Sequence, residues 1–125
     1  MSKETHILVV DDNPPMTDTL TMILEAKGYA VHAAYSGSAA LEILQDHPVD
    51  ILLTDVRMPD MNGVELYLAT RKNHPHLVTF LMTAYADNDI IDQGLREGIK
   101  TILTKPLNID MLLMMFSAVI RDDHG

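Results

Sequence analysis

Five polar residues that could carry phosphate and metal chemistry stand directly after short apolar runs: Asp11, Asp12, Asp55, Thr83 and Lys105. Carboxylates are ligands that suit Mg²⁺, and a hydroxyl and an ammonium both donate hydrogen bonds to phosphate oxygens. If the fold brings the carboxylates together, they need a cation, because like charges raise one another's pKa. In such a cluster Asp55 would be the nucleophile. Lys105 would supply a movable positive charge, and Thr83 a hydrogen bond, to phosphate oxygens.

The periodicity of the chain predicts five strands that alternate with five helices. Short apolar runs indicate the strands, and apolar residues at helical spacing between turn residues indicate the helices. We expect strands at 6–10, 30–34, 51–54, 79–82 and 101–104, and helices at 14–27, 38–45, 63–73, 87–97 and 108–120. This alternation predicts a doubly wound parallel α/β sheet with helices on both faces. Ligands bind such sheets at the carboxyl ends of the strands, where the five polar residues should converge.

Composition limits the kinds of function that the chain can have. Its 125 residues are 47% hydrophobic, which predicts a single domain spanning residues 1–125. A formal net charge of −9 argues against direct binding of nucleic acid, and the absence of cysteine excludes thiol chemistry. The sequence has neither an apolar run long enough to span a membrane nor an N-terminal signal stretch, so we expect a cytoplasmic protein.

The order and spacing of the polar residues resemble the response-regulator receiver domain family over essentially the whole chain. The matching motifs are Asp11-Asp12, then Asp55 with Met58-Pro59-Asp60-Met61-Asn62-Gly63 after it, then Thr83-Ala84, and then Lys105-Pro106. The resemblance implies a flavodoxin-like fold with strand order 2-1-3-4-5. It also implies a signalling switch that receives its phosphoryl group from a histidine kinase or phosphotransfer protein, without true enzymatic turnover.

The same resemblance implies roles for individual residues. Asp12, Asp55 and the backbone carbonyl of Arg57 would bind Mg²⁺ or Mn²⁺, with Asp11 assisting through water. Asp55 would accept the phosphoryl group and Lys105 would contact it, with a cis peptide bond before Pro106. Thr83 would be the switch residue that changes the surface of the fourth helix, fifth strand and fifth helix, which controls an output domain or partner.

Two departures from the commonest pattern of the family concern how the signal travels and how long it lasts. Ile102 stands where many receivers have tyrosine or phenylalanine, so we expect the signal to pass through Thr83 and the loop that carries Tyr85. Arg57 and Tyr85 would flank the path of a water that attacks the phosphoaspartate, and we expect them to set its lifetime.

Other interpretations of the same residues remain open. Each acidic residue could cap a helix, with Asp12 or Asn13 as the cap of the first one, and Lys105-Pro106 could form an ordinary turn. A phosphohydrolase that forms an aspartyl-phosphate is one alternative function. Such families typically place an acid two residues after the nucleophile, where this chain has Arg57. A pseudo-receiver that acts without phosphorylation is the other.

Two further groups of residues lie outside these motifs. The last helix has Met111, Met114 and Met115 beside or opposite its core-facing stripe, which favours homodimerisation or docking of an output domain there. Wider burial of the helix, or a few exposed methionines without a partner, is the simpler alternative. His74 and His76 flank a proline and could be imagined as a metal pair, but no other histidine is near them in the sequence. We expect the remaining histidines to be surface residues or strand flanks.

Overall fold

A computed structural model of the protein describes residues 4–84, 88–99 and 101–124. Its elements alternate between strand and helix in the order β1 (His6–Val10), α1 (Pro14–Ala26), β2 (Ala30–Ala34), α2 (Gly37–Asp46), β3 (Ile51–Asp55), α3 (Gly63–Arg71), β4 (Val78–Thr83), α4 (Asn88–Glu97), β5 (Thr101–Thr104) and α5 (Ile109–His124). The predicted alternation is therefore confirmed.

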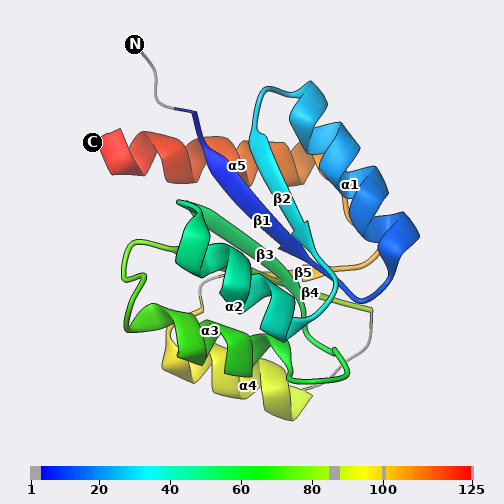
Figure 1. Ribbon diagram of the computed structural model, residues 1–125, viewed down its shortest axis with the longest axis vertical. Coiled ribbons are helices and arrows are strands. Elements are labelled where there is room, and N and C mark those ends of the chain that lie inside the picture. Colours follow the sequence, from blue (N-terminus) through cyan, green and yellow to red (C-terminus); the bar gives the residue numbers. More distant parts are fainter. Residues whose placement is uncertain (1–3, 85–87, 100, 125) are drawn as a thin grey trace.

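The five strands form one parallel sheet in the order β2-β1-β3-β4-β5 (Figure 1). This order confirms the doubly wound topology and places β1 and β3 side by side at its centre. The chain winds from β1 to β2 on one side and crosses to β3 on the other side of β1, so the carboxyl ends of β1 and β3 border the switch point at which ligands bind in such sheets.

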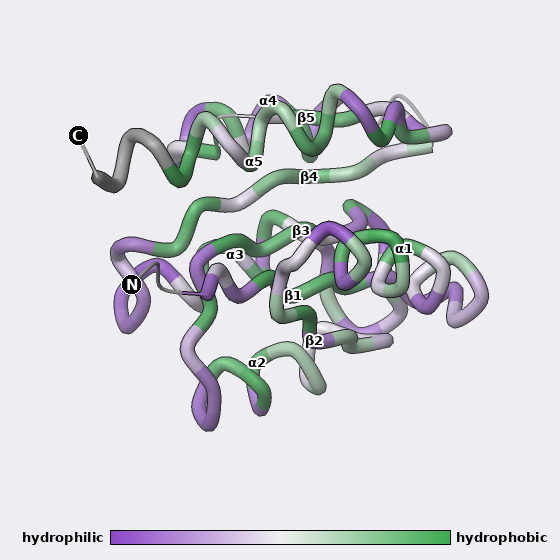
Figure 2. The backbone as a smooth tube through the Cα atoms, turned by 90° about the horizontal axis from the view of Figure 1, so that it is seen from above, coloured by the Kyte–Doolittle hydropathy of each residue, from purple (hydrophilic) through white to green (hydrophobic). Residues whose placement is uncertain are grey.

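Both faces of the sheet are covered by helices, and each face has its own buried apolar cluster. Alternate residues of β1 divide between the faces: Ile7 and Val9 join α1 and α5, whereas Leu8 and Val10 join α2 and α3. A third cluster packs α3 and α4 against β4. Burial on both faces explains why the strands are nearly continuous apolar runs, which Figure 2 shows as hydrophobic segments inside more hydrophilic helices and loops.

Several element boundaries differ from the prediction. Helix α2 begins at Gly37, one residue earlier than expected, because the hydroxyl of Ser36 accepts the N–H of Ala39 and caps the helix. Helix α3 ends at Arg71, two residues early, and α5 continues to His124. Asp87 and Tyr85, which belong to the predicted start of α4 and the loop before it, lie outside the described residues.

The methionines of α5 divide into two environments. Met111 and Met114 are 51% and 72% exposed, as expected for an outer face. Met115 instead is partly buried and packs against the cluster between α1, α5 and the sheet, so it adds less to the exposed surface than we predicted. Although α5 is apolar on much of its circumference, neither it nor any other helix in the described ranges is long and apolar enough to cross a membrane.

Candidate functional site

The structure brings the three predicted carboxylates together at the carboxyl edge of the sheet. Asp11 follows β1 and is buried, Asp55 ends β3 and is half-buried, and Asp12 is exposed. One oxygen of each lies within 4.8 Å of the others, and no other such group of acidic or histidine side chains occurs among the described residues. His74 and His76 are therefore not part of a described cluster of this kind. The predicted convergence of the acidic residues is observed.

Lys105 reaches into the same cluster from the end of β5. Its Nζ donates hydrogen bonds to Asp11 Oδ2 at 2.8 Å and to Asp55 Oδ2 at 3.2 Å. The side chains of Lys105 and Asp55 are each 14% exposed, so these contacts are only partly screened by water. The three carboxylates carry more negative charge than the ammonium of Lys105 neutralises, which favours a divalent cation.

Burial and neighbouring charges shift the pKa values of this cluster in a consistent way. Burial raises the pKa of Asp55, and the nearby charge of Asp11 raises it further, while the ammonium of Lys105 opposes both effects. Burial alone would lower the pKa of Lys105, but its hydrogen bonds and charge contacts with Asp11 and Asp55 outweigh burial and raise it. The lysine therefore stays charged and holds two acidic groups that repel each other.

The local structure after β1 explains how Asp11 is held. Its carboxylate accepts the N–H of Asn13 at 3.1 Å, and its carbonyl accepts the hydroxyl of Thr17 at 3.0 Å. Helix α1 is capped by Asn13, whose side chain accepts the N–H of Met16. Because Asn13 supplies the cap, Asp11 is not needed for it and points toward Lys105 instead.

Backbone packing fixes the position of Asp55. The N–H of Val56 donates to the carbonyl of Met82 on β4, and the N–H of Gly63 donates back to the carbonyl of Val56. A Cβ atom at Gly63 would meet the carbonyl oxygen of Asp55 at 2.5 Å and a Leu81 methyl group at 2.9 Å. Glycine is thus required where the first turn of α3 passes behind the acidic residue.

The acidic side chains open into a cleft of about 270 Å³, lined by Asp11, Asp12, Asn13, Asp55, Val56, Arg57, Thr83, Ala84 and Lys105. All the predicted site residues that the structure describes therefore share one cleft. Thr83 is buried at the end of β4, and its carbonyl accepts the N–H of Lys105. The peptide bond between Lys105 and Pro106 is cis, as the resemblance implied.

Two arrangements at the site and in the sheet depend on long-range pairing and were not predicted from the sequence. Asp60 accepts hydrogen bonds from Gly37 and Ser38 at the start of α2. The Ser36-Gly37-Ser38 stretch is typical of a helix N-terminus and could have suggested that an acidic capping partner lies nearby. The ring of His32 also stacks with two other histidine rings. Its centroid lies 5.8 Å from that of His6 and 4.7 Å from that of His47. His6 begins β1 and His47 is exposed, as expected for flanking and surface residues, but the stacking of the three rings around His32 was not predicted.

The fold is a doubly wound sheet, and an acidic cluster with Lys105 lies at its switch point. Together they define a class of protein, the phosphoacceptor-type module. Comparison with known proteins gives the family. The model of the response regulator receiver domain matches residues 7–117, and the chain belongs to this family.

Individual relatives agree with this assignment. The chain is 36% identical over 118 residues to the transcriptional regulatory protein CpxR of Escherichia coli (strain K12), covering 94% of this chain and 50% of that protein. It is 33% identical over 110 residues to the transcriptional regulatory protein GlrR of the same strain, covering 88% of this chain and 25% of that protein. The chain thus spans a quarter to a half of these relatives.

Solved structures show the same fold. A receiver domain protein (CheY-like) from Methanospirillum hungatei JF-1 has a TM-score of 0.89 and 28% identity, with 98% of this chain and 100% of that chain covered. The signal receiver domain of an HD domain-containing protein from Pseudomonas fluorescens Pf-5 has a TM-score of 0.92 and 26% identity, with 98% of both chains covered.

Proposed function

We propose that the chain is a phosphorylation-activated switch in which Asp55 accepts a phosphoryl group from a phosphohistidine of a kinase or phosphotransfer protein. One observation carries the proposal. The Asp55 carboxylate lies at the carboxyl end of β3 in an open cleft, 3.2 Å from an ammonium that Asp11 also holds. From this position the Asp55 carboxylate can attack the phosphorus atom of a donor, and the Lys105 ammonium can bind the negatively charged phosphoryl oxygens.

The donor set of the cleft fits a hard divalent cation. Its acidic oxygens lie within 4.8 Å of one another and carry more negative charge than Lys105 neutralises. Asp12, Asp55 and the backbone carbonyl of Arg57 would hold Mg²⁺, or Mn²⁺, with Asp11 acting through water. When bound, the ion neutralises charge on the oxygens of the transferred phosphoryl group.

In the transfer itself, one Asp55 oxygen forms a bond to phosphorus while the bond between phosphorus and the donor imidazole nitrogen breaks. The imidazole leaves, and the product is an acyl phosphate on Asp55. Lys105 then moves from the carboxylates to the phosphoryl oxygens, and the Thr83 hydroxyl donates to one of them. These movements shift β5 and the adjoining α4 and α5, which alters the surface that the output reads.

Labelling of the protein by a small phosphodonor tests this function. With acetyl phosphate and Mg²⁺, mass spectrometry should show one added phosphoryl group on the natural protein and none on Asp55→Asn. Glu25→Gln, on the exposed face of α1, is the control and should label normally. Phosphate retained on Asp55→Asn would overturn the assignment of Asp55. Sustained turnover of small phosphate esters would instead identify a phosphohydrolase.

The phosphohistidine donor needs a docking surface beside the cleft, and an apolar groove of about 470 Å³ adjoins it. The groove is lined by Asn13, Pro15, Met16, Thr19, Leu20, Ile23, Leu107 and Ile109, and Asn13 also lines the acidic cleft. It is larger than the cleft but has no ionisable side chain, so it suits partner contact rather than chemistry. We expect Ile23→Arg to slow transfer from a phosphohistidine protein and to leave labelling by acetyl phosphate unchanged.

The exposed part of α5 supplies a second contact surface. Met111 and Met114 are exposed, and Met111 also borders a cleft of about 270 Å³ between β5 and α5. We assign this face to a second copy of the chain, because phosphorylation would shift the same elements. Met111→Glu combined with Met114→Glu should lower the sedimentation coefficient of the phosphorylated protein to that of the unphosphorylated one. Unchanged sedimentation with lost docking of an output domain would identify that domain as the occupant instead.

A further inference from the structure

The loop between β3 and α3, residues 56–62, carries the Arg57 carbonyl that the proposed function assigns to the metal. The backbone holds both ends of this loop. Val56 N–H donates to Met82 O at 3.0 Å, and Gly63 N–H donates to Val56 O at 2.8 Å. Contacts at the middle of the loop therefore decide where the Arg57 carbonyl lies relative to Asp55.

Asp60 ties the middle of the loop to a different helix. Its carboxylate accepts the N–H of Gly37 at 3.1 Å, the N–H of Ser38 at 2.8 Å and the hydroxyl of Ser38 at 2.7 Å. Gly37 and Ser38 are the first residues of α2, whose N–H groups have no partner inside the helix and favour an anion. The Ser38 hydroxyl and then the two N–H groups lower the pKa of Asp60 to about 2.

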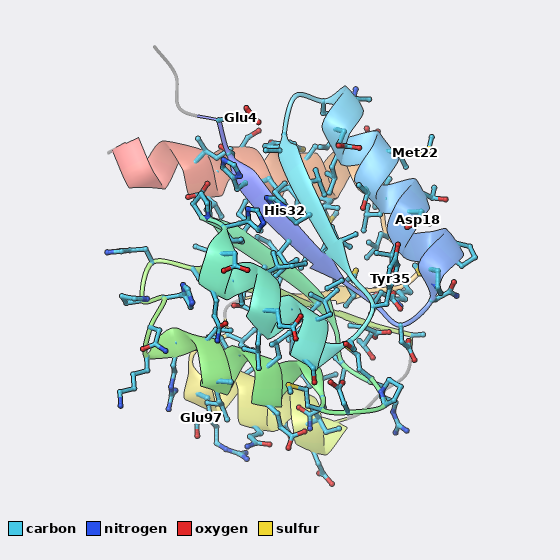
Figure 3. The ribbon with its side chains drawn as sticks, in the orientation of Figure 1. Glu4, Asp18, Met22, His32, Tyr35 and Glu97 are labelled. Atoms are coloured by element: carbon cyan, nitrogen blue, oxygen red, sulfur yellow. The ribbon has the colours of Figure 1, made fainter. Side chains whose placement is uncertain are left out.

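The start of α2 is itself a fixed point. Ser36 caps the helix through Ala39, and the hydroxyl of Tyr35 donates to Asp18 of α1 at 2.6 Å (Figure 3). A Cβ atom at Gly37 would collide with the side chain of Met61, so the loop also packs closely against this point. Because Ser36 already caps α2, the hydrogen bonds to Asp60 fix the position of the loop at least as much as they stabilise the helix.

We propose that Asp60 is a positioning residue of the phosphoacceptor site, which anchors the loop to α2 and thereby holds the Arg57 carbonyl where Mg²⁺ binds. The inference rests on the proposed function, from which the role of Arg57 comes. Asp60 lies three residues from Arg57 and acts through the loop backbone. Groups that hold a metal ligand in place typically change metal affinity by a factor of 10 or more when they are lost.

Two variants separate positioning from simple helix capping. Asp60→Ala removes the link between loop and helix, whereas Ser36→Ala removes a cap of the same helix and leaves the link in place. Titration with MgCl₂, followed by NMR of backbone amides, should show binding weakened roughly tenfold in Asp60→Ala and unchanged in Ser36→Ala. Both variants should lower the urea midpoint of the metal-free protein, because each removes hydrogen bonds at the same helix terminus.

Two milder variants keep the test decisive if Asp60→Ala does not fold. Asp60→Asn retains one acceptor oxygen and should bind Mg²⁺ with an affinity between those of Asp60→Ala and the natural protein. Ser38→Ala removes the shortest of the three bonds from the α2 side and should weaken Mg²⁺ binding about threefold. If Asp60 only capped α2, substitution of Ser38 on that helix would not change the affinity for Mg²⁺.

The outcomes are distinguishable from failure of the proposed function. If the natural protein binds Mg²⁺ and labels at Asp55 while the variants at residues 60 and 38 bind Mg²⁺ equally well, the positioning inference alone is overturned. Equal weakening by Ser36→Ala would also overturn it, because general loss of stability would then be the cause. A natural protein that neither binds Mg²⁺ nor labels would overturn the proposed function and this inference together.

Discussion

The two ends of the sheet both gather titratable side chains from separate elements, but they do so in opposite ways. At the carboxyl ends of the strands, Asp11 and Asp55 share the ammonium of Lys105. Toward the amino ends, His32 of β2 (Figure 3) lies between the rings of His6 and His47. One cluster pairs opposite charges and opens into a cleft, and the other stacks three rings of the same kind.

The pKa shifts show what this difference means. Burial raises the pKa of Asp55 and lowers that of His32, so burial favours the neutral form in both places. Charged neighbours of the same kind add to the shift in each case: Asp11 at Asp55, and His47 and then His6 at His32. Lys105 opposes the shift at Asp55, whereas every cause at His32 lowers its pKa, so the carboxyl end pairs opposite charges and the histidine stack does not.

The largest predicted effect tests whether the carboxyl end depends on close backbone packing. Gly63→Ala should lower the free energy of unfolding by roughly 2–3 kcal/mol, because its Cβ would overlap the backbone of Asp55. Urea denaturation measures the change. Gly94→Ala in α4 is the matched control, since its nearest contact is a Val64 methyl at 3.0 Å and alanine favours the helix. If both variants are equally stable, the packing behind Asp55 is not restrictive.

Removing the positive charge of Lys105 should leave the carboxylates at the carboxyl end of the sheet to repel one another. Lys105→Met should lower the free energy of unfolding at pH 7 by about 2 kcal/mol without metal, because Asp11 and Asp55 then repel without compensation. The loss should shrink as the pH falls toward 4, since protonation removes the repulsion. Urea denaturation at both pH values measures this. A loss that is independent of pH would mean that Lys105 stabilises the fold by packing.

A smaller effect of opposite sign is expected for the phosphoacceptor itself. The raised pKa of Asp55 means that the folded state binds its proton more tightly, so this residue's contribution to stability declines as the pH rises through the folded pKa. Asp55→Asn should therefore raise the free energy of unfolding at pH 7, on the order of 1 kcal/mol, and should lose the gain at low pH. Thermal denaturation of both proteins at pH 7 and at pH 3.5 measures whether Asp55→Asn is stabilising at each pH.

The carboxyl end was predictable from the sequence, because the rule that locates it is local. Each strand is an apolar run that stops at a polar residue, and parallel strands bring those stops to one edge. Asp11, Asp55 and Lys105 could therefore be placed together before the structure was known. The chemistry of the helix termini was partly missed, since Ser36 and Ser38 are equally plausible caps and only the bond to Asp60 assigns them different partners.

The histidine stack was not predictable in this way. It depends on the β1–β2 register, which pairs Leu8 with His32, and on the end of α2, where His47 is the C-cap. Neither follows from periodicity, because histidines in half-buried strands look like ordinary flanking residues. The exposed face of α5 was predicted in outline, but Met115 packs inward because the helix turns it toward the cluster between α1 and the sheet.

The smallest predicted effect concerns that stack. The pKa of His32 is lowered by burial and by the charges of His47 and His6, while the carboxylate of Asp50 accepts the backbone N–H of His6 nearby. Because the folded pKa lies below the unfolded value of about 6.5, the stabilisation is complete above pH 6.5 and declines as the pH falls through that value. The stack is partly exposed, so we expect a loss of only a few tenths of a kcal/mol.

His32→Phe keeps a ring between His6 and His47 and removes the proton, so it separates stacking from titration. Urea denaturation at pH 8 gives the effect of the substitution when the natural ring is neutral, and the same measurement at pH 5.5 adds the cost of protonation. The natural protein should lose slightly more stability between the two pH values than the variant does. Equal losses would show that water screens the stack fully. A larger loss in the variant would mean that the protonated ring has an anionic partner, in which case the two ends of the sheet would be alike.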